Sequence, residues 1–307
     1  MKIDKTDIRH YGLELLSGSL DGVFAYPKRV AMRQNDWAEA DGVEPDVLFP
    51  EFESKQVTLQ FILHTSGPYA FRELYKEVIR VLSAPGYRRI DFGTGKEYAL
   101  RYVRTGQFSL PRPQSDELAT AQFSVTFMDD QPVDHIGLAS RPSGGIDPGD
   151  GLYLNKYTFA DFGITMEAGT DRLLQYPNVK DPFTDGGVVD VSTLQTGKKE
   201  VTLNLLMVAG SSEEFYNNHA ALFRELAAPG IQTLTVQGIP IPICYLDCPS
   251  SRLEKWSEDQ IILSLGIKLL IPIISWVDAG GSVVVSVLFD DIDGIITDED
   301  GTVLELN

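Results

Sequence analysis

The stretch that decides the fold is Lys55-Gln56-Val57-Thr58-Leu59-Gln60-Phe61-Ile62-Leu63, and it returns 144 residues later as Lys199-Glu200-Val201-Thr202-Leu203-Asn204-Leu205-Leu206-Met207. The two copies stay aligned without a gap from position 55 to position 86, and 10 of these 32 pairs are identical. Both aligned segments end on Ala-Pro-Gly, at 84–86 and at 228–230. Two β-rich stretches that resemble each other by chance would not also share this ending. The sequence therefore predicts a duplicated domain.

Each copy predicts the same succession of elements. Residues 57–63 and 201–207 are rich in β-branched and apolar residues, which predicts a strand with at least one buried face. Apolar residues at spacings of three and four then predict a helix in each copy. They are Phe71, Leu74, Tyr75, Val78 and Leu82 in the first copy, and Phe215, His219, Leu222, Phe223 and Leu226 in the second. A serine of the Ser211-Ser212 pair can cap the second helix, and the Pro-Gly pairs end both helices.

Short strands are predicted after each helix, at 89–92, 98–103 and 121–128, and again at 232–236, 241–246 and 261–271. The fold class predicted is α+β and mainly β, with one helix on a sheet face in each copy. A turn-rich linker at 141–151 separates a first domain at 1–140 from a second at 152–276. Residues 277–307 are predicted to form an acidic β-hairpin extension, with strands at 282–288 and 303–306, a hairpin turn at 297–302, and eight acids but no Lys or Arg.

Composition places the 307-residue chain among ordinary globular proteins, since 43% of its residues are hydrophobic and 23% are charged. Lys and Arg number 26 against 44 Asp and Glu, which gives a formal net charge of −18. Binding to nucleic acid needs clustered cations that displace counterions from phosphates, so this balance argues against it. No stretch is apolar enough to span a membrane and the N-terminus has no signal-peptide core, so we expect a soluble chain.

Patterns that would carry chemistry are missing from the sequence. The four histidines, His10, His64, His135 and His219, have no His or Cys partner at a metal-ligand spacing, and we expect His219 to pack on its helix. Cys244 and Cys248 lack a second pair and are interpreted as structural thiols. The Asp-rich end does not follow the spacing of an EF-hand. We therefore predict no catalytic, metal or cofactor site and no enzymatic activity, although a pair of carboxylates distant in sequence stays possible.

A resemblance to a known family rests on the second copy. Its run Phe183-Thr184-Asp185-Gly186-Gly187-Val188-Val189-Asp190-Val191-Ser192-Thr193-Leu194, the loop after it, and the strand from Lys199 resemble the distal tail proteins of long-tailed phages. The helix with its Pro-Gly stop continues the resemblance, and the first copy follows it more weakly. The loop at 35–45 of the first copy is composed differently and lacks the Asp-x-Ser/Thr pattern.

The resemblance implies two tandem tail-tube-like domains, each a β-sandwich or barrel flanked by one helix. It also implies a structural virion protein in the phage tail, made in the host cytoplasm, that forms a hexameric ring, or a trimer acting as a pseudohexamer, at the distal tail or baseplate hub. The ring would connect the tube to tail-tip or receptor-binding proteins, and DNA would pass through without specific binding. Candidate interface residues are Trp37, Phe49, Phe52, Phe183, Val188 and Val189. The alternative is a non-viral β-sandwich module that binds carbohydrate or protein.

Overall fold

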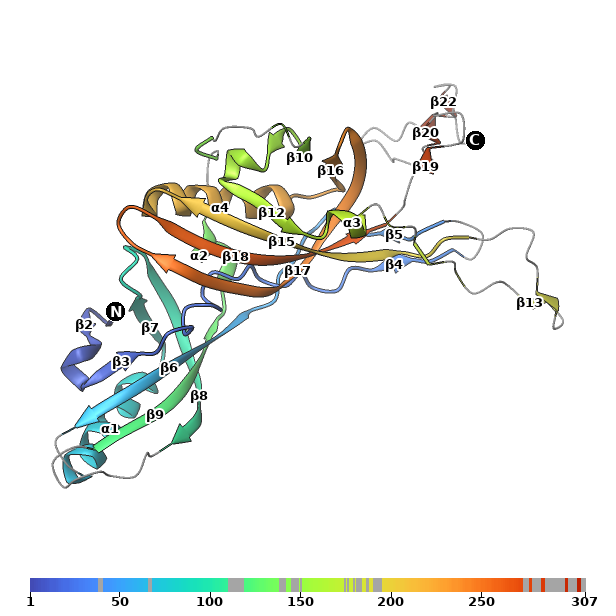
Figure 1. Cartoon of the computed structure of the whole chain (residues 1–307). Helices are drawn as coiled ribbons and strands as arrows, with labels where there is room; N and C mark the ends of the chain where they lie inside the picture. Colours follow the sequence, from blue (N-terminus) through green and yellow to red (C-terminus); the bar gives the residue numbers. More distant parts are fainter. Residues whose placement is uncertain are drawn as a thin grey trace.

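The structure is a computed structural model, and it describes most of the chain. The described residues are 1–37, 41–65, 68–109, 119–137, 142–144, 149, 151–173, 175, 177–178, 180, 184–185, 188–189, 195–272, 276–277, 283–284, 296–297 and 303–304. The chain is mainly β with few helices, as the sequence predicts. Two antiparallel seven-stranded sheets dominate it, and a helix packs on each (Figure 1).

The first sheet has the strand order β2-β1-β7-β8-β9-β6-β3. Its strands are β1 (Lys2–Ile3), β2 (Thr6–Asp7), β3 (Leu13–Leu15), β6 (Lys55–Thr65), β7 (Tyr87–Asp91), β8 (Glu97–Ser109) and β9 (Ala119–Asp129). The 3-10 helix η1 (Ile8–Tyr11), the helices α1 (Pro68–Leu82) and α2 (Pro132–Ile136), and a small hairpin of β4 (Gln34–Asn35) and β5 (Glu44–Pro45) complete this part of the chain.

The second sheet has the order β11-β10-β16-β17-β18-β15-β12. Each of its strands occupies the same place as the equivalent strand of the first sheet. Its strands are β10 (Leu152–Leu154), β11 (Tyr157–Thr158), β12 (Ile164–Ala168), β15 (Lys199–Ala209), β16 (Gln232–Val236), β17 (Ile239–Trp256) and β18 (Ile261–Ile271). The helices are η2 (Ala160–Phe162), α3 (Thr170–Leu173) and α4 (Ser212–Leu226), and a two-stranded hairpin joins β13 (Thr184–Asp185) to β14 (Val188–Val189). We refer to the two sheets with their helices as the first and second units.

The strands that carry the sequence repeat form the centre of each unit. β6 pairs with β9 over its whole length, and β15 pairs with β18 in the equivalent way. Alternate residues of these strands are buried against α1 or α4, so that one sheet face contributes to the core. Ser211 caps α4 as predicted, because its hydroxyl accepts a hydrogen bond from the Glu214 backbone N–H at 3.2 Å.

A glycine at the same place in both units allows the edge strand to approach the centre. Gly12 and Gly163 both have a φ of 65°, and a Cβ atom there would lie 2.6 Å from the His64 carbonyl oxygen and 2.5 Å from the Val208 carbonyl oxygen, respectively. His64 and Val208 are aligned by the 144-residue repeat. Only glycine combines this left-handed backbone with so close an approach.

Both units also contain a close contact between a glycine and a serine on neighbouring strands, but the two residue types have exchanged strands. Gly106 of β8 lies against the Ser124 hydroxyl of β9, whereas Ser250 of β17 lies against Gly266 of β18. A Cβ atom on either glycine would clash with the facing hydroxyl. Each unit thus has one glycine and one serine facing each other on its two long paired strands. The missing side chain of the glycine leaves space for the serine side chain of the neighbouring strand.

Several short elements were not predicted from the sequence, because too few residues are present to show a helical or strand periodicity. The hairpins β1–β2 and β10–β11 have two or three residues in each strand, and α2 has five residues. Of the acidic extension, only β19 (Trp276–Val277), which pairs with β20 (Val283–Val284), and β21 (Ile296–Thr297), which pairs with β22 (Val303–Leu304), are described. The domain boundaries stay a prediction.

Candidate interaction surface

Two long connections, which we call arms, leave the sheets at equivalent places. The first arm is residues 16–54, between β3 and β6, and the second arm is residues 169–198, between β12 and β15. A lysine at the start of the following strand holds the base of each arm. Lys55 donates to the Val23 and Ala25 carbonyls at 2.7 and 2.9 Å, and Lys199 donates to the carbonyls of Leu173, at 3.0 Å, and Gln175.

The first arm crosses from its own unit to α4 of the second unit. The Tyr26 ring lies 4.4 Å from the His219 ring and stacks on Phe223 at 5.1 Å, measured between centroids, and its hydroxyl donates to the His219 carbonyl at 2.8 Å. Phe24 stacks on Trp256 at 5.7 Å and meets Phe215 edge-on at 5.2 Å. These aromatic rings fill the space between arm and helix, so the two units share one continuous core.

The same arm also runs along the open edge of β17, where the blue segment of Figure 1 passes beside the orange strand. The Arg29 N–H donates to the Leu246 carbonyl at 2.8 Å, and the Leu253 N–H donates to the Asp21 carboxylate at 3.0 Å. The Tyr245 hydroxyl donates to the Pro27 carbonyl at 2.9 Å. The arm therefore satisfies backbone groups of β17 that β16, which pairs only with residues 239–243, leaves free.

Further along, the first arm meets the second arm and the end of β18. The Gly42 N–H donates to the Thr196 carbonyl at 2.7 Å, and the Val43 N–H donates to the Pro272 carbonyl at 2.8 Å. The Asp41 carboxylate accepts from both the backbone and the hydroxyl of Thr196. The contact between the units thus extends from α4 to the far end of the second sheet.

Burial lowers the pKa of two basic side chains near this contact, His219 and Lys55. The pKa of His219 is lowered to about 3, mainly by desolvation, which outweighs the raising effect of the bond to Phe24 and is assisted by the nearby charges of Lys55 and Lys96. Its Nε2 lies 2.8 Å from the Phe24 carbonyl oxygen, so the neutral ring donates there. Desolvation also lowers the pKa of Lys55 to about 8. His219 is therefore a buried packing residue, as its position on the apolar helix face indicates.

The sequence-predicted interface residues fall into three groups. Trp37 and Phe49 lie on the outside of the first arm, with exposed fractions of 53% and 85%. Phe52 packs inward, with its ring 5.2 Å from that of Phe223. Phe183 lies outside the described residues, and Val188 and Val189 form β14, but their side chains are not among those described. Their role in an interface stays a prediction.

Leu48 is a neighbour of Phe49 that the sequence reasoning missed, and it is 65% exposed. It lies in an irregular loop without periodicity, so no pattern distinguishes it from a core leucine. Trp37, Leu48 and Phe49 give the first arm a set of exposed apolar side chains. Contiguous exposed apolar patches mark contacts with other proteins, and Leu48 and Phe49 are adjacent in the sequence.

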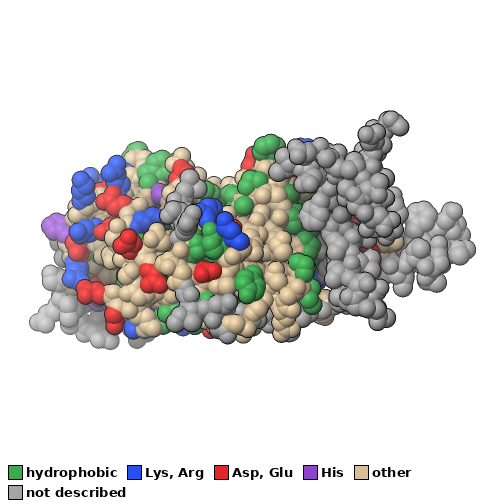
Figure 2. Space-filling view, turned by 90° about the horizontal axis from the view of Figure 1, so that it is seen from above, with side chains coloured by type: hydrophobic (Ala, Val, Ile, Leu, Met, Phe, Trp, Pro, Cys, Tyr) green, Lys and Arg blue, Asp and Glu red, His purple; other side chains and the backbone are tan. Residues whose placement is uncertain are grey.

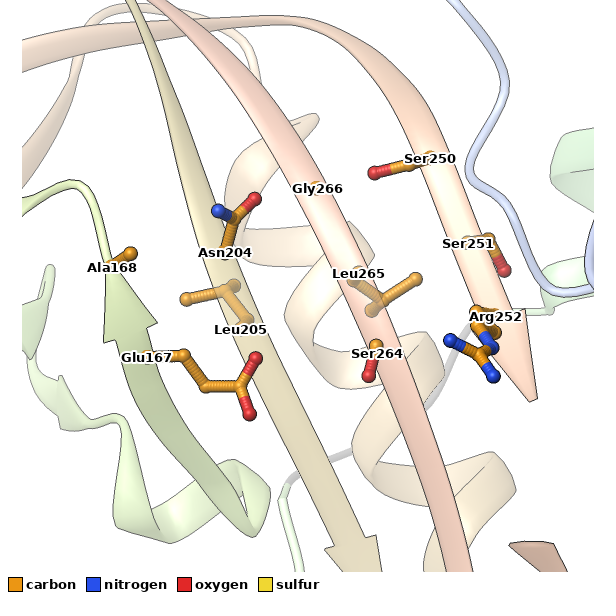
Figure 3. Close-up of a pocket in the computed structure, with 10 residues that line it drawn as sticks. All are labelled: Glu167, Ala168, Asn204, Leu205, Ser250, Ser251, Arg252, Ser264, Leu265 and Gly266. Carbon is orange, nitrogen blue, oxygen red and sulfur yellow. The ribbon is translucent and has the colours of Figure 1, made fainter. Parts of the chain in front are cut away.

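A shallow hollow of about 200 Å³ lies on the face of the second sheet opposite α4 (Figure 3). Asn204, Gly266 and Ser250 follow one another across β15, β18 and β17, and Glu167 and Arg252 lie at opposite sides. Its lining contains no aromatic side chain. A stacking platform for a sugar ring is therefore missing from this hollow, and nothing in it favours the carbohydrate-binding alternative.

The sequence was also compared with known proteins. No protein-family model and no curated protein matches it. Among solved structures, the chain is similar to the crystal structure of the Dit protein of phage SPP1, described as a paradigm of the hub adsorption apparatus in phages that infect Gram-positive bacteria. The match covers 87% of this chain and 96% of that chain, with 11% sequence identity and a TM-score of 0.30. A TM-score this low does not establish a shared fold, so the proposals below depend on this chain's own geometry.

The described residues contain neither a metal-binding cluster nor a membrane-spanning helix. No group of three or more His, Cys, Asp or Glu among them could hold a metal ion. No helix in the described part of the chain is long and apolar enough to cross a membrane. On the face in Figure 2, basic and acidic side chains are intermingled, without an extended basic patch among the described residues. The apolar side chains Trp37, Leu48 and Phe49 on the first arm are the exposed groups on which the proposal below builds.

Proposed function

We propose that the chain is a structural protein of a phage tail that assembles into a ring at the distal tail or baseplate hub. In this proposal three chains contribute two units each to a pseudohexamer, and a hexamer of chains is the alternative assembly. The ring connects the tail tube to tail-tip or receptor-binding proteins. The motif resemblance of the second copy to distal tail proteins suggests this role, and the geometry of the duplication supports it.

The observation that carries the proposal is the contact between the two units. The first arm of one unit lies on the helix and the open strand edge of the next, so the contact joins two different surfaces of similar units. A head-to-tail contact between two units leaves one contact surface of each unit unused. Repeated from unit to unit, it closes into a ring or continues as a filament. A chain with one such contact inside it is suited to make the same contact with its neighbours.

The charge of the chain is compatible with a passage for DNA. A surface that DNA slides past should bind phosphate weakly, and a net charge of −18 repels it. The apolar side chains Trp37, Leu48 and Phe49 on the first arm are then available to neighbouring tail proteins. Phe183, Val188 and Val189 are proposed to act in the same way on the second arm.

The experiment that tests the function is a measurement of assembly on the purified full chain. Sedimentation velocity combined with negative-stain images should show annular particles whose mass corresponds to three chains, or to six in the alternative. A strict monomer at the highest soluble concentration, with no annular particles, would contradict the proposal. Specific binding in a glycan array by such a monomer would favour the carbohydrate-binding alternative.

A further inference from the structure

The helix of the first unit lacks the cover that the helix of the second unit has. Val78 and Leu82 of α1 are buried, as are their counterparts Leu222 and Leu226 of α4. The other apolar positions differ. Phe71, Tyr75 and Ile79 are only half-buried, whereas their counterparts Phe215, His219 and Phe223 are buried beneath the first arm. Equivalent helices on equivalent sheets thus differ by the presence of an arm.

An exposed aromatic group marks the uncovered place. Phe71 stacks on Tyr75 with centroids 5.8 Å apart, and Phe108 at the end of β8 lies 5.2 Å from Tyr75. Phe108 is 43% exposed. We call Phe71, Tyr75, Ile79 and Phe108 the α1 face. It is an apolar surface of the first unit with no described segment packed over it from outside.

The strand beside this face has an open edge. β7 pairs with β8 only over residues 97–101, and β9 occupies the other side of β8 as far as Ser109. No described segment bonds to the free edge of residues 103–109. The equivalent edge of β17 is the one that the first arm covers, through Arg29 and Asp21. An unpaired strand edge invites pairing with another chain.

The second arm repeats the part of the first arm that makes these contacts. Asp21-Gly22-Val23-Phe24-Ala25-Tyr26-Pro27 matches Asp171-Arg172-Leu173-Leu174-Gln175-Tyr176-Pro177 at an offset of 150 residues, with Asp, Tyr and Pro identical. The structure supports the same alignment, because Lys55 and Lys199 bind the carbonyls of aligned residues, 23 and 25 in one arm and 173 and 175 in the other. Val23 and Leu173 are both buried, as are Pro27 and Pro177.

We infer that the α1 face and the open edge of β8 are the docking site for the second arm of another copy of this chain. The inference rests on the proposed ring and names its contact between chains. The first arm makes the contact once inside the chain, on α4 and β17. The second arm, through the Asp171 to Pro177 segment, makes it again on α1 and β8 of the neighbour. Tyr176 is then the counterpart of Tyr26, with Tyr75 and Ile79 in the places of His219 and Phe223.

Two variants separate the halves of this contact. Phe108→Lys places a charge on the α1 face, and Tyr176→Ala removes the ring that the inference assigns to the α1 face of the neighbour. Each variant alone should sediment as a monomer at a concentration where the wild-type chain is assembled, which corresponds to at least a tenfold weaker association. The matched control is Glu73→Lys, which places the same charge on the opposite, exposed side of α1. This control should assemble like the wild type.

Mixing the two variants gives the decisive result. The Phe108→Lys chain keeps an intact second arm and the Tyr176→Ala chain keeps an intact α1 face, so a mixture should form a one-to-one dimer that neither variant forms alone. Circular dichroism melting checks that each variant is folded, and Tyr75→Arg replaces Phe108→Lys if the latter is not. If the wild type assembles and both variants assemble as well, the docking inference is wrong although the ring stands. If the wild type itself stays monomeric, the proposed function fails.

Discussion

The helices α1 and α4 occupy the same place in two sheets of the same strand order, yet their outer sides differ. On α4, the aromatic side chains Phe215 and Phe223 are buried under the first arm, and His219 lies between them. On α1, the equivalent side chains remain half-exposed. The comparison teaches that the helix alone does not complete the core of a unit. On α4 the first arm completes the core, whereas on α1 no described segment does so.

The largest expected difference between the units comes from truncating equivalent residues. Phe223→Ala should lower the free energy of unfolding of the monomeric chain by about 4 kcal/mol, because a buried aromatic ring leaves a cavity. Ile79→Ala at the equivalent position of α1 should cost about 1–2 kcal/mol, because the side chain is only half-buried. Urea unfolding under conditions where the chain is monomeric measures both. Equal losses would show that the arm adds nothing to the packing of α4.

A smaller effect is expected from the buried histidine of α4. The pKa of His219 is about 3 in the folded chain and 6.5 in the reference state, so the unfolded chain binds more protons between these values. Its contribution to stability is therefore present above pH 6.5 and is lost as the pH falls towards 3. Between pH 6.5 and pH 4 the wild type should lose about 3 kcal/mol more than His219→Gln, whose amide can still donate to the Phe24 carbonyl.

Thermal melting of both proteins across this pH range is the measurement. Carboxylates such as Asp130, whose pKa its bonds to Arg101 lower, also weaken the fold in acid. They are present in both proteins, so the difference between the two profiles isolates the histidine. Parallel profiles would show that His219 takes up a proton without disturbing the arm.

The sequence predicted the parts of the fold that depend on local pattern. The repeated strand and helix, the serine cap of α4 and the glycines that end both helices could be recognised because each depends on residues a few positions apart. Gly86 and Gly230 indeed have φ values of 89° and 87°. The lengths of β8 and β17 were underestimated, since register shifts break the alternation of both strands.

The contact between the units could not be predicted in the same way. Tyr26 meets His219 across 193 residues of sequence, and nothing local to either residue indicates the other. The arms also align at an offset of 150 residues instead of 144, because the second arm is six residues shorter than the first between the matched segment and the following strand. The shared Asp, Tyr and Pro of the arms can be aligned only with the help of the structure, because the contacts of Lys55 and Lys199 show which arm residues correspond.

Hydrogen–deuterium exchange of the chain in its assembled and dissociated states tests the central claim most directly. The account predicts that assembly slows exchange of the amides of α1 and of residues 103–109 in β8, and of the second arm at 171–178. The amides of α4 and of residues 246–253 in β17 should exchange at the same slow rate in both states, because the first arm already covers them. Protection confined to other surfaces, or exchange at α1 and β8 that assembly leaves unchanged, would contradict the account.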